Sequence, residues 1–202
     1  HSPSFLMGCI QSGVKISIVR LTYRNGLATA RVLPSDVILR LMRNPLLRST
    51  GVLNGLFYEN VVVCEADTDR AFYQEINERL LVDKPECGIP NCLFINAQNK
   101  QTLHVIMAPL RHLGIPAAGI VDIDVLKDGG RNWTNLLSGA NIPEISHEPL
   151  ARQRSALRDS LEATKRNFKK EGGIALLPKS ERESASDLFE QLGHYGIFVV
   201  RE

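Results

Sequence analysis

The sequence predicts an α/β protein with a parallel sheet that has helices on both faces. From residue 61 onward, short continuous apolar runs alternate with longer amphipathic segments, and such runs are typical of strands buried on both faces. Two of the runs end in acidic residues, as expected at the edge of a parallel sheet where ligands bind. The 202 residues, 44% of them hydrophobic and 23% charged, suffice for one large domain, or one domain and part of another.

The first expected element is an antiparallel β-hairpin within residues 15–32. Apolar and polar residues alternate there on both sides of Asn25-Gly26. Asn-Gly is the strongest short hairpin signal, because both turn positions tolerate a positive φ.

A helix should follow this hairpin. Ser35 and Asp36 suit its start, and Pro45 should interrupt it. Gly51 and Gly55 then indicate a loosely structured joint.

Alternating strands and helices are expected in the rest of the chain. Strands are predicted at 60–65, 92–97, 115–124, 173–177 and 197–202, and helices at 68–81, 100–113, 131–140, 149–173 and 180–196. In the first of these helices, Phe72, Ile76 and Leu80 recur at four-residue spacing, which predicts a buried stripe.

Four acidic residues are expected to meet at one edge of the sheet. Glu65 ends the first of these strands, Asp122 and Asp124 end the third, and Asp69 lies one turn into the helix after Glu65. Residues two apart in a strand point to the same side, so Asp122 and Asp124 should aim together. Each acid alone is explained as a helix cap or a capped loop. Together they repel one another, which points to a hard divalent cation such as Mg2+ or Mn2+.

This succession of segments resembles the Toprim domain that topoisomerases, bacterial primases and several nucleases share. The resemblance rests on VVVCEADTD, INAQNKQTLHVIMAPLRHLGIP and GIVDID, and it covers about residues 60–126. It implies a Rossmann-like parallel sheet with the family's acidic positions at Glu65, Asp69, Asp122 and Asp124. Lys100 matches a position that is often basic in the family, which implies a phosphate contact, whereas a solvent-exposed lysine at a helix start explains it equally well.

The first residues narrow the resemblance. HSPSFL resembles the switch-histidine segment that closes the core of ABC-type ATPases, with His1 approaching the nucleotide. An ABC-type ATPase that ends in a hairpin and continues into a Toprim domain is the layout of the OLD (overcoming lysogenisation defect) nucleases. The resemblance implies that residues 1–56 are the C-terminal edge of the ATPase domain with a linker, and that residues 57–202 are a Toprim domain whose C-terminal truncation stays open. It also implies ATP as a ligand of the ATPase domain and a homodimer formed through that domain.

For such a protein the resemblance implies a divalent-metal-dependent DNA endonuclease that nicks or cleaves by two-metal hydrolysis. Glu65 and Asp122 would be the catalytic residues, with Glu65 holding a metal or assisting water deprotonation. Asp122 would bridge two Mg2+ or Mn2+ ions, and Asp69 and Asp124 would complete their ligand shells.

The family also has a further acid and a catalytic lysine nearer the C-terminus. Glu202 and Lys179 are the nearest residues of their kind, but neither matches the family pattern. We therefore expect this chain to bind metal less completely than a whole protein of the family, and to be incomplete for activity.

Charge and composition bear on the partners. Residues 1–60 carry seven basic and two acidic residues, whereas acids outnumber bases in the remainder. This asymmetry suits DNA held by one part and cut by another, although solvated arginines explain it equally well. No apolar run is long enough to span a membrane, the start lacks the pattern of a signal peptide, and the four cysteines form no CxxC pair. A cytoplasmic protein with reduced thiols is expected.

Two other functions stay open. DIDVLKDGG, which begins at Asp122, is similar to the nucleophile motif of haloacid-dehalogenase-type phosphatases, but that family carries this motif on its first core strand. The chain could also be a non-catalytic Toprim-like interaction module whose acids bind an ion for structure.

Overall fold

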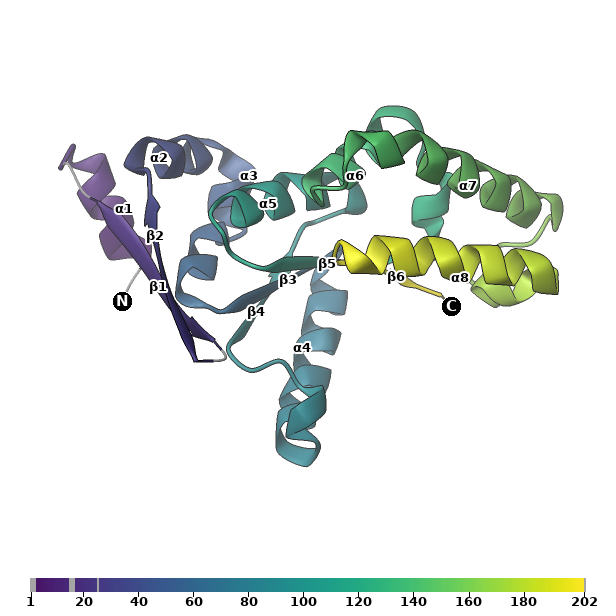
Figure 1. Cartoon of the computed structure of the whole chain (residues 1–202), viewed down its shortest axis with the longest axis horizontal. Coiled ribbons are helices and arrows are strands. Elements are labelled where there is room, and N and C mark those ends of the chain that lie inside the picture. Colours follow the sequence, from purple (N-terminus) through teal and green to yellow (C-terminus); the bar gives the residue numbers. More distant parts are fainter. Residues whose placement is uncertain (1–2, 15–16, 25, 202) are drawn as a thin grey trace.

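The computed structural model describes residues 3–14, 17–24 and 26–201. Its centre is a four-stranded parallel sheet with the strand order β4-β3-β5-β6 (Figure 1). The strands are β3 (Asn60–Cys64), β4 (Cys92–Asn96), β5 (Ala117–Asp122) and β6 (Ile197–Val200). The predicted α/β class with a parallel sheet is therefore confirmed.

Helices lie on both faces of this sheet. They are α4 (Asp67–Asp83) on one face, α5 (Lys100–His112) and α6 (Gly130–Gly139) on the other, and α7 (Glu144–Ala163) and α8 (Lys179–His194) toward β6 (Figure 1). Gly119 in β5 allows α5 to approach closely, because a Cβ at this position would lie 2.7 Å from side-chain atoms of Leu103 and Met107. None of the helices in the described ranges combines the length and the apolar content of a membrane span.

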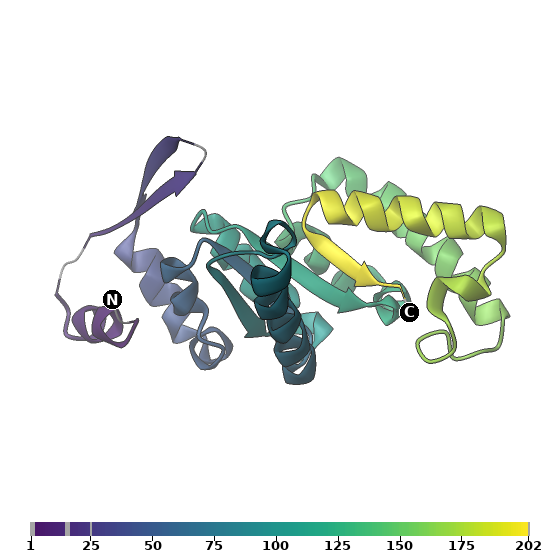
Figure 2. The same ribbon diagram turned by 90° about the horizontal axis from the view of Figure 1, so that it is seen from below.

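An N-terminal hairpin projects from this body (Figure 2). It consists of β1 (Ile18–Arg24) and β2 (Leu27–Leu33), which pair antiparallel as predicted. The predicted turn residue Asn25 lies outside the described residues, and Gly26 has a φ of +79°. Val19, Leu21 and Tyr23 alternate along one face of β1, and all three side chains are exposed.

Short helices flank the hairpin in the sequence. They are α1 (Pro3–Gln11), before the hairpin, and α2 (Ser35–Arg43) and α3 (Pro45–Ser49), after it. Pro45 separates α2 from α3, as predicted. The loosely structured joint predicted around Gly51 and Gly55 is wrong, because the 3-10 helix η1 (Val52–Phe57) forms there and its first residues are buried. A Cβ on Gly55 would lie 2.8 Å from Leu110 Cδ2, so this glycine permits close packing against α5.

The buried stripe predicted on α4 is also wrong. Phe72 is 61% exposed and Ile76 is 37% exposed, whereas Asn77 is the buried residue of this helix. The Asn77 amide donates to the carbonyl of Ile89 at 3.0 Å and accepts from its N–H at 2.7 Å. A polar side chain, not an apolar stripe, ties α4 to the following loop.

The long charged helix predicted at 149–173 is wrong in extent. α7 ends at Ala163 and residues 164–172 form turns, while the predicted strand at 173–177 is instead the 3-10 helix η4 (Gly173–Leu176). Phe168 explains why the chain leaves the helix here, because its side chain is only 2% exposed and its ring lies 4.7 Å from the Lys127 ammonium group. Burial of this ring holds the segment against the body.

Candidate metal centre

Three carboxylates converge at the carboxyl edge of the sheet. Glu65 directly follows β3, Asp122 ends β5, and Asp124 lies two residues further on. One ligand oxygen from each residue lies within 4.8 Å of the other two. The structure therefore brings together three of the four acids that the sequence predicted for one site.

Glu65 is held in place by the neighbouring strand. Its Oε1 accepts a hydrogen bond from the backbone N–H of Asp122 at 2.9 Å. Burial raises the pKa of Glu65 to about 7, and the negative charges of Asp122 and Asp124 add to this rise, while the Asp122 N–H and Lys100 oppose it. Near neutral pH this carboxyl is therefore poised between its two protonation states.

Asp124 reaches the site by a different route from the one predicted. It does not continue β5, because the chain turns after Asp122 into the 3-10 helix η3 (Ile123–Lys127). The expected reason for their convergence, same-side alternation along one strand, is therefore wrong, although the carboxylates do meet. Ile123 is buried, which anchors the turn between the two acids.

Two lysines lie among these acids. Lys169 Nζ is 2.6 Å from Asp122 Oδ2 and 3.5 Å from Asp124 Oδ2. Lys100 Nζ is 3.1 Å from Asp124 Oδ1 and 3.4 Å from Asp128 Oδ2. The acids near Lys169 raise the pKa of this lysine, above all through the hydrogen bond to Asp122, so its ammonium group is a positive charge held beside the acids.

The donor set fits a hard divalent cation. Carboxylate oxygens are the ligands that Mg2+ and Mn2+ prefer. Asp124 Oδ1 is buried and accepts no hydrogen bond from the residues that the structure describes, although the Lys100 ammonium lies within ion-pair distance of it. Cys64, at the end of β3, does not belong to this group of ligand atoms, and burial raises the pKa of its thiol to about 12.

Asp69 is placed differently from the other acids. Its Oδ2 accepts a hydrogen bond from the backbone N–H of Ala66 at 3.2 Å, which caps the first turn of α4. It does not belong to the group of three ligand oxygens within 4.8 Å. Its role as a metal ligand stays a prediction, and His1, the predicted nucleotide switch, lies outside the described residues.

The sequence did not predict Lys169 and Asp128 as parts of this centre. Lys169 lies within the helix predicted at 149–173, and only the end of α7 at Ala163 brings it back to the sheet. No pattern in the sequence links Asp128 to the site, where its carboxylate shares Lys100 with Asp124. The one available signal was Phe168, an aromatic residue within a basic run that a solvated helix would not need.

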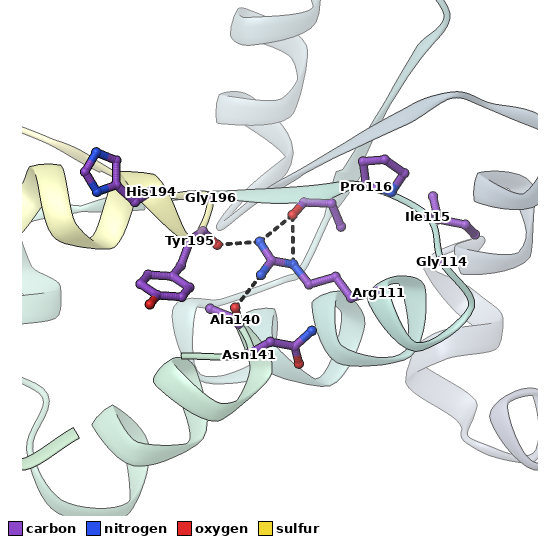
Figure 3. Close-up of a pocket in the computed structure, with 10 residues that line it drawn as sticks. Arg111, Gly114, Ile115, Pro116, Ala140, Asn141, His194, Tyr195 and Gly196 are labelled. Atoms are coloured by element: carbon purple, nitrogen blue, oxygen red, sulfur yellow. Dashed lines mark hydrogen bonds between the residues drawn. The ribbon is translucent and has the colours of Figure 1, made fainter. Parts of the chain in front are cut away.

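The opposite edge of the sheet carries a different polar cluster (Figure 3). Arg111 donates from Nε and Nη2 to the carbonyl of Ala117 at 3.0 and 2.7 Å, and from Nη2 to the carbonyl of Tyr195 at 2.5 Å. It also donates to the carbonyl of Ala140. This guanidinium joins α5, β5, α6 and α8 at a shallow pocket, and its partners are backbone atoms, as expected of a structural clamp.

The fold and the acidic edge define a class of protein. A parallel sheet of order β4-β3-β5-β6 with carboxylates after β3 and β5 is the arrangement expected of a Toprim domain. Residues 56–124 match the family model described as overcoming lysogenization defect protein-like, TOPRIM domain. Residues 56–124 therefore form an OLD-like Toprim domain, which confirms the predicted resemblance for this part of the chain. Comparisons with curated proteins and with solved structures found no match.

Proposed function

We propose that this chain provides the nuclease centre of an OLD-type ATPase–nuclease, and that it hydrolyses DNA phosphodiester bonds with Mg2+ or Mn2+. The observation that carries the proposal is the meeting of Glu65, Asp122 and Asp124 at the carboxyl edge of a Toprim sheet. An acidic triad beside two lysines has the means both to hold a cation and to face a phosphate.

Each side chain has a proposed task. Glu65, Asp122 and Asp124 would hold one cation tightly, and Asp69 would contribute to a second, looser site through the carboxylate oxygen that does not cap α4. Bound cations supply a Lewis acid for the phosphodiester and lower the pKa of a water molecule. In place of a metal contact, Glu65 would assist deprotonation of the attacking water. Lys169 would neutralise charge on the phosphate.

The remaining domain proposals follow from the family. Residues 1–56 would form the C-terminal edge and linker of an ABC-type ATPase domain, with His1 directed toward ATP, and residues 57–202 the Toprim domain. The ATPase domain would hold two copies together, and DNA would be the substrate of the assembly in the cytoplasm.

A plasmid assay tests the nuclease proposal. The full-length protein that carries this chain is incubated with supercoiled DNA and Mg2+ or Mn2+, as wild type and as Asp122→Ala. Nicked or linear product that requires metal, and that falls at least about a hundredfold in the variant, supports the proposal. Asp187→Ala is the matched control, since Asp187 is an exposed acid on α8, and it should cleave as wild type does.

Other outcomes would favour the competing functions. Hydrolysis of a small phosphate ester, lost in Asp122→Ala, would support a phosphatase of the haloacid-dehalogenase type instead. Metal binding without either activity would support a non-catalytic interaction module. Either result would overturn the nuclease proposal.

A further inference from the structure

The start of α6 has the features of an anion site. This ten-residue helix begins at Gly130 after Gly129, no side chain in the described part of the chain caps it, and its first turn contains no acidic residue. The first N–H groups of a helix lack partners within the helix and lie at the positive end of its dipole. A sequence usually places Ser, Thr, Asp or Asn there, whereas this chain has Asp128 one position too early and two glycines.

The side chains near the start of α6 are positively charged, whereas negatively charged groups are favoured at the start of a helix. Arg154 of α7 is only 6% exposed, and its guanidinium faces Gly129, because a Cβ on that glycine would lie 3.2 Å from Nη2 and 3.6 Å from Cζ. Its hydrogen bonding among the described residues consists of one bond, from Nη1 to the carbonyl of Leu126 at 2.7 Å, and its Nε is buried without an acceptor. Arg131, in the first turn, is exposed.

This arrangement is costly unless an anion completes it. A buried cation needs a counter-charge or several acceptors, and burial lowers the pKa of Arg154 accordingly. The ring of Trp133 lies 5.7 Å from its Cζ, which supplies only part of the compensation. Asp128 and Asp159 act on Arg154 at longer range, and Asp128 also lies near Lys100.

We propose that the start of α6, together with Arg154 and Arg131, binds a backbone phosphate of the nucleic-acid substrate. The inference rests on the proposed nuclease function and adds a second contact to it. Helix N-termini with adjacent glycines are suited to phosphate, since the backbone N–H groups point at the ligand and no Cβ blocks its approach. Gly130 has a φ of +56° and open space around it.

The position of this site relative to the triad assigns it to a neighbouring phosphate. Asp128, directly before Gly129, lies 3.4 Å from Lys100, which lies 3.1 Å from Asp124. Gly129, the residue before α6, is thus adjacent in sequence to Asp128, and Asp128 contacts the same lysine as Asp124 of the metal centre. A strand whose scissile phosphate lies at the triad would present its next phosphates toward α6.

Inorganic phosphate is the first probe. In an amide NMR titration of the chain with EDTA present, the signals of Gly130, Arg131 and Asn132 should move with added phosphate and not with added chloride. In Gly129→Asp, which places a carboxylate at the helix start, these signals should no longer respond. Gly129 has a φ of −121°, so the aspartate is accommodated if the Arg154 guanidinium moves by a few tenths of an ångström.

A labelled DNA duplex is the second probe, with binding measured by fluorescence anisotropy in EDTA. Arg131→Gln and Gly129→Asp should each weaken binding by about tenfold, and Arg131→Gln should lower the salt dependence by about one released counterion. Arg79→Gln is the control and should bind as wild type does, since Arg79 is an exposed basic residue on α4. Arg131 is a surface residue, so Arg131→Gln tests the site without the risk of unfolding that a substitution of the buried Arg154 would carry.

The outcomes separate this site from the nuclease proposal. Unchanged DNA affinity in both variants overturns the site, whether or not free phosphate binds, because an adventitious ion only would then occupy it. Loss of DNA affinity with normal Mn2+ binding supports the site. If the wild type binds DNA through α6 but never cleaves it with metal, the nuclease proposal alone fails.

Discussion

Glu65 links β3 to β5 and is part of the candidate metal centre. Its carboxyl accepts the N–H of Asp122 across the sheet, and its environment favours the protonated form. A divalent cation needs the ionised form, so proton and metal compete for the same side chain.

The first prediction concerns pH. Because the pKa of Glu65 is about 7, the affinity for Mn2+ should fall by about tenfold per pH unit below pH 7 and level off above it. Calorimetric titrations between pH 6 and pH 8 at constant ionic strength measure this. Glu65→Gln keeps an oxygen for the Asp122 N–H but cannot ionise, so its weaker binding should be flat over the same range. A flat wild-type profile would contradict the prediction.

The same proton affects stability without metal. The pKa of this carboxyl lies at about 7 in the folded chain and at the ordinary value of 4.5 when exposed, so the folded state binds the proton more tightly. The free energy of unfolding should therefore decrease as pH rises from about 4.5 to about 7, with no further decrease from this group above that.

The second prediction concerns Lys169, which lies 2.6 Å from Asp122. Removing its charge in Lys169→Met should raise the Mn2+ affinity by roughly threefold to tenfold, because a competing cation is lost. DNA cleavage should nevertheless fall, since the phosphate would lose a positive contact. Lys170→Met is the matched control and should change neither quantity. Weaker metal binding in Lys169→Met would show that the lysine does not compete with the ion.

At the scale of elements, α4 shows how far periodicity can predict a helix. The helix itself was predicted within two residues at each end, because the strand before it and the acids at its start are local signals. The buried face of α4 was not predicted correctly, because the loop after this helix supplies the hydrogen-bond partner of Asn77. The same holds for α7, whose end depends on the burial of Phe168, a contact between distant parts of the chain. A charge-rich segment has no periodicity that reveals such an end.

The third prediction separates two roles of Asp69. Asp69→Ala should cost about 1 kcal/mol of unfolding free energy, because the Ala66 N–H loses its acceptor, whereas Asp69→Asn should keep most of that stability. Both variants should lose the weaker of two Mn2+ ions and retain the tighter one, as measured by calorimetric stoichiometry with thermal unfolding in parallel. If both variants keep two ions, Asp69 is a helix cap and no metal ligand. Two tight ions in the wild-type chain would contradict the expectation that its site is incomplete.

At the scale of the whole molecule, the sheet and its acidic edge follow from chain order. Apolar strands separated by helices predict parallel strands, and parallel strands place their carboxyl ends together, so Glu65 could be paired with Asp122 from the sequence alone. Lys169 and Arg154 could not be placed, because they come from segments after β5 whose paths depend on packing, whereas Lys100 opens the predicted helix before β5. The acids and Lys100 were thus predictable as parts of this edge, and Lys169 was not.

The fourth prediction concerns the clamp at the opposite edge. Arg111→Met leaves the carbonyls of Ala117, Ala140 and Tyr195 without this donor, which should cost about 3 kcal/mol and lower the melting temperature by about 6–12 °C. Arg79→Met removes an exposed ion pair with Glu75 and should cost less than about 1 kcal/mol. Calorimetry of unfolding compares the two variants. A loss of Mn2+ affinity in folded Arg111→Met would contradict the assignment of this residue to structure.

The position of Arg111 also has a practical consequence. The side chains that would do chemistry and the guanidinium that binds the layers together are separated by the full length of the strands. Substitutions that stabilise packing at the amino edge, around Ala140 and Tyr195, can therefore offset the free-energy cost of repulsion among the carboxylates without changing the geometry of these carboxylates. A sheet of this kind tolerates an electrostatically unfavourable carboxyl edge because contacts at its amino edge stabilise the fold.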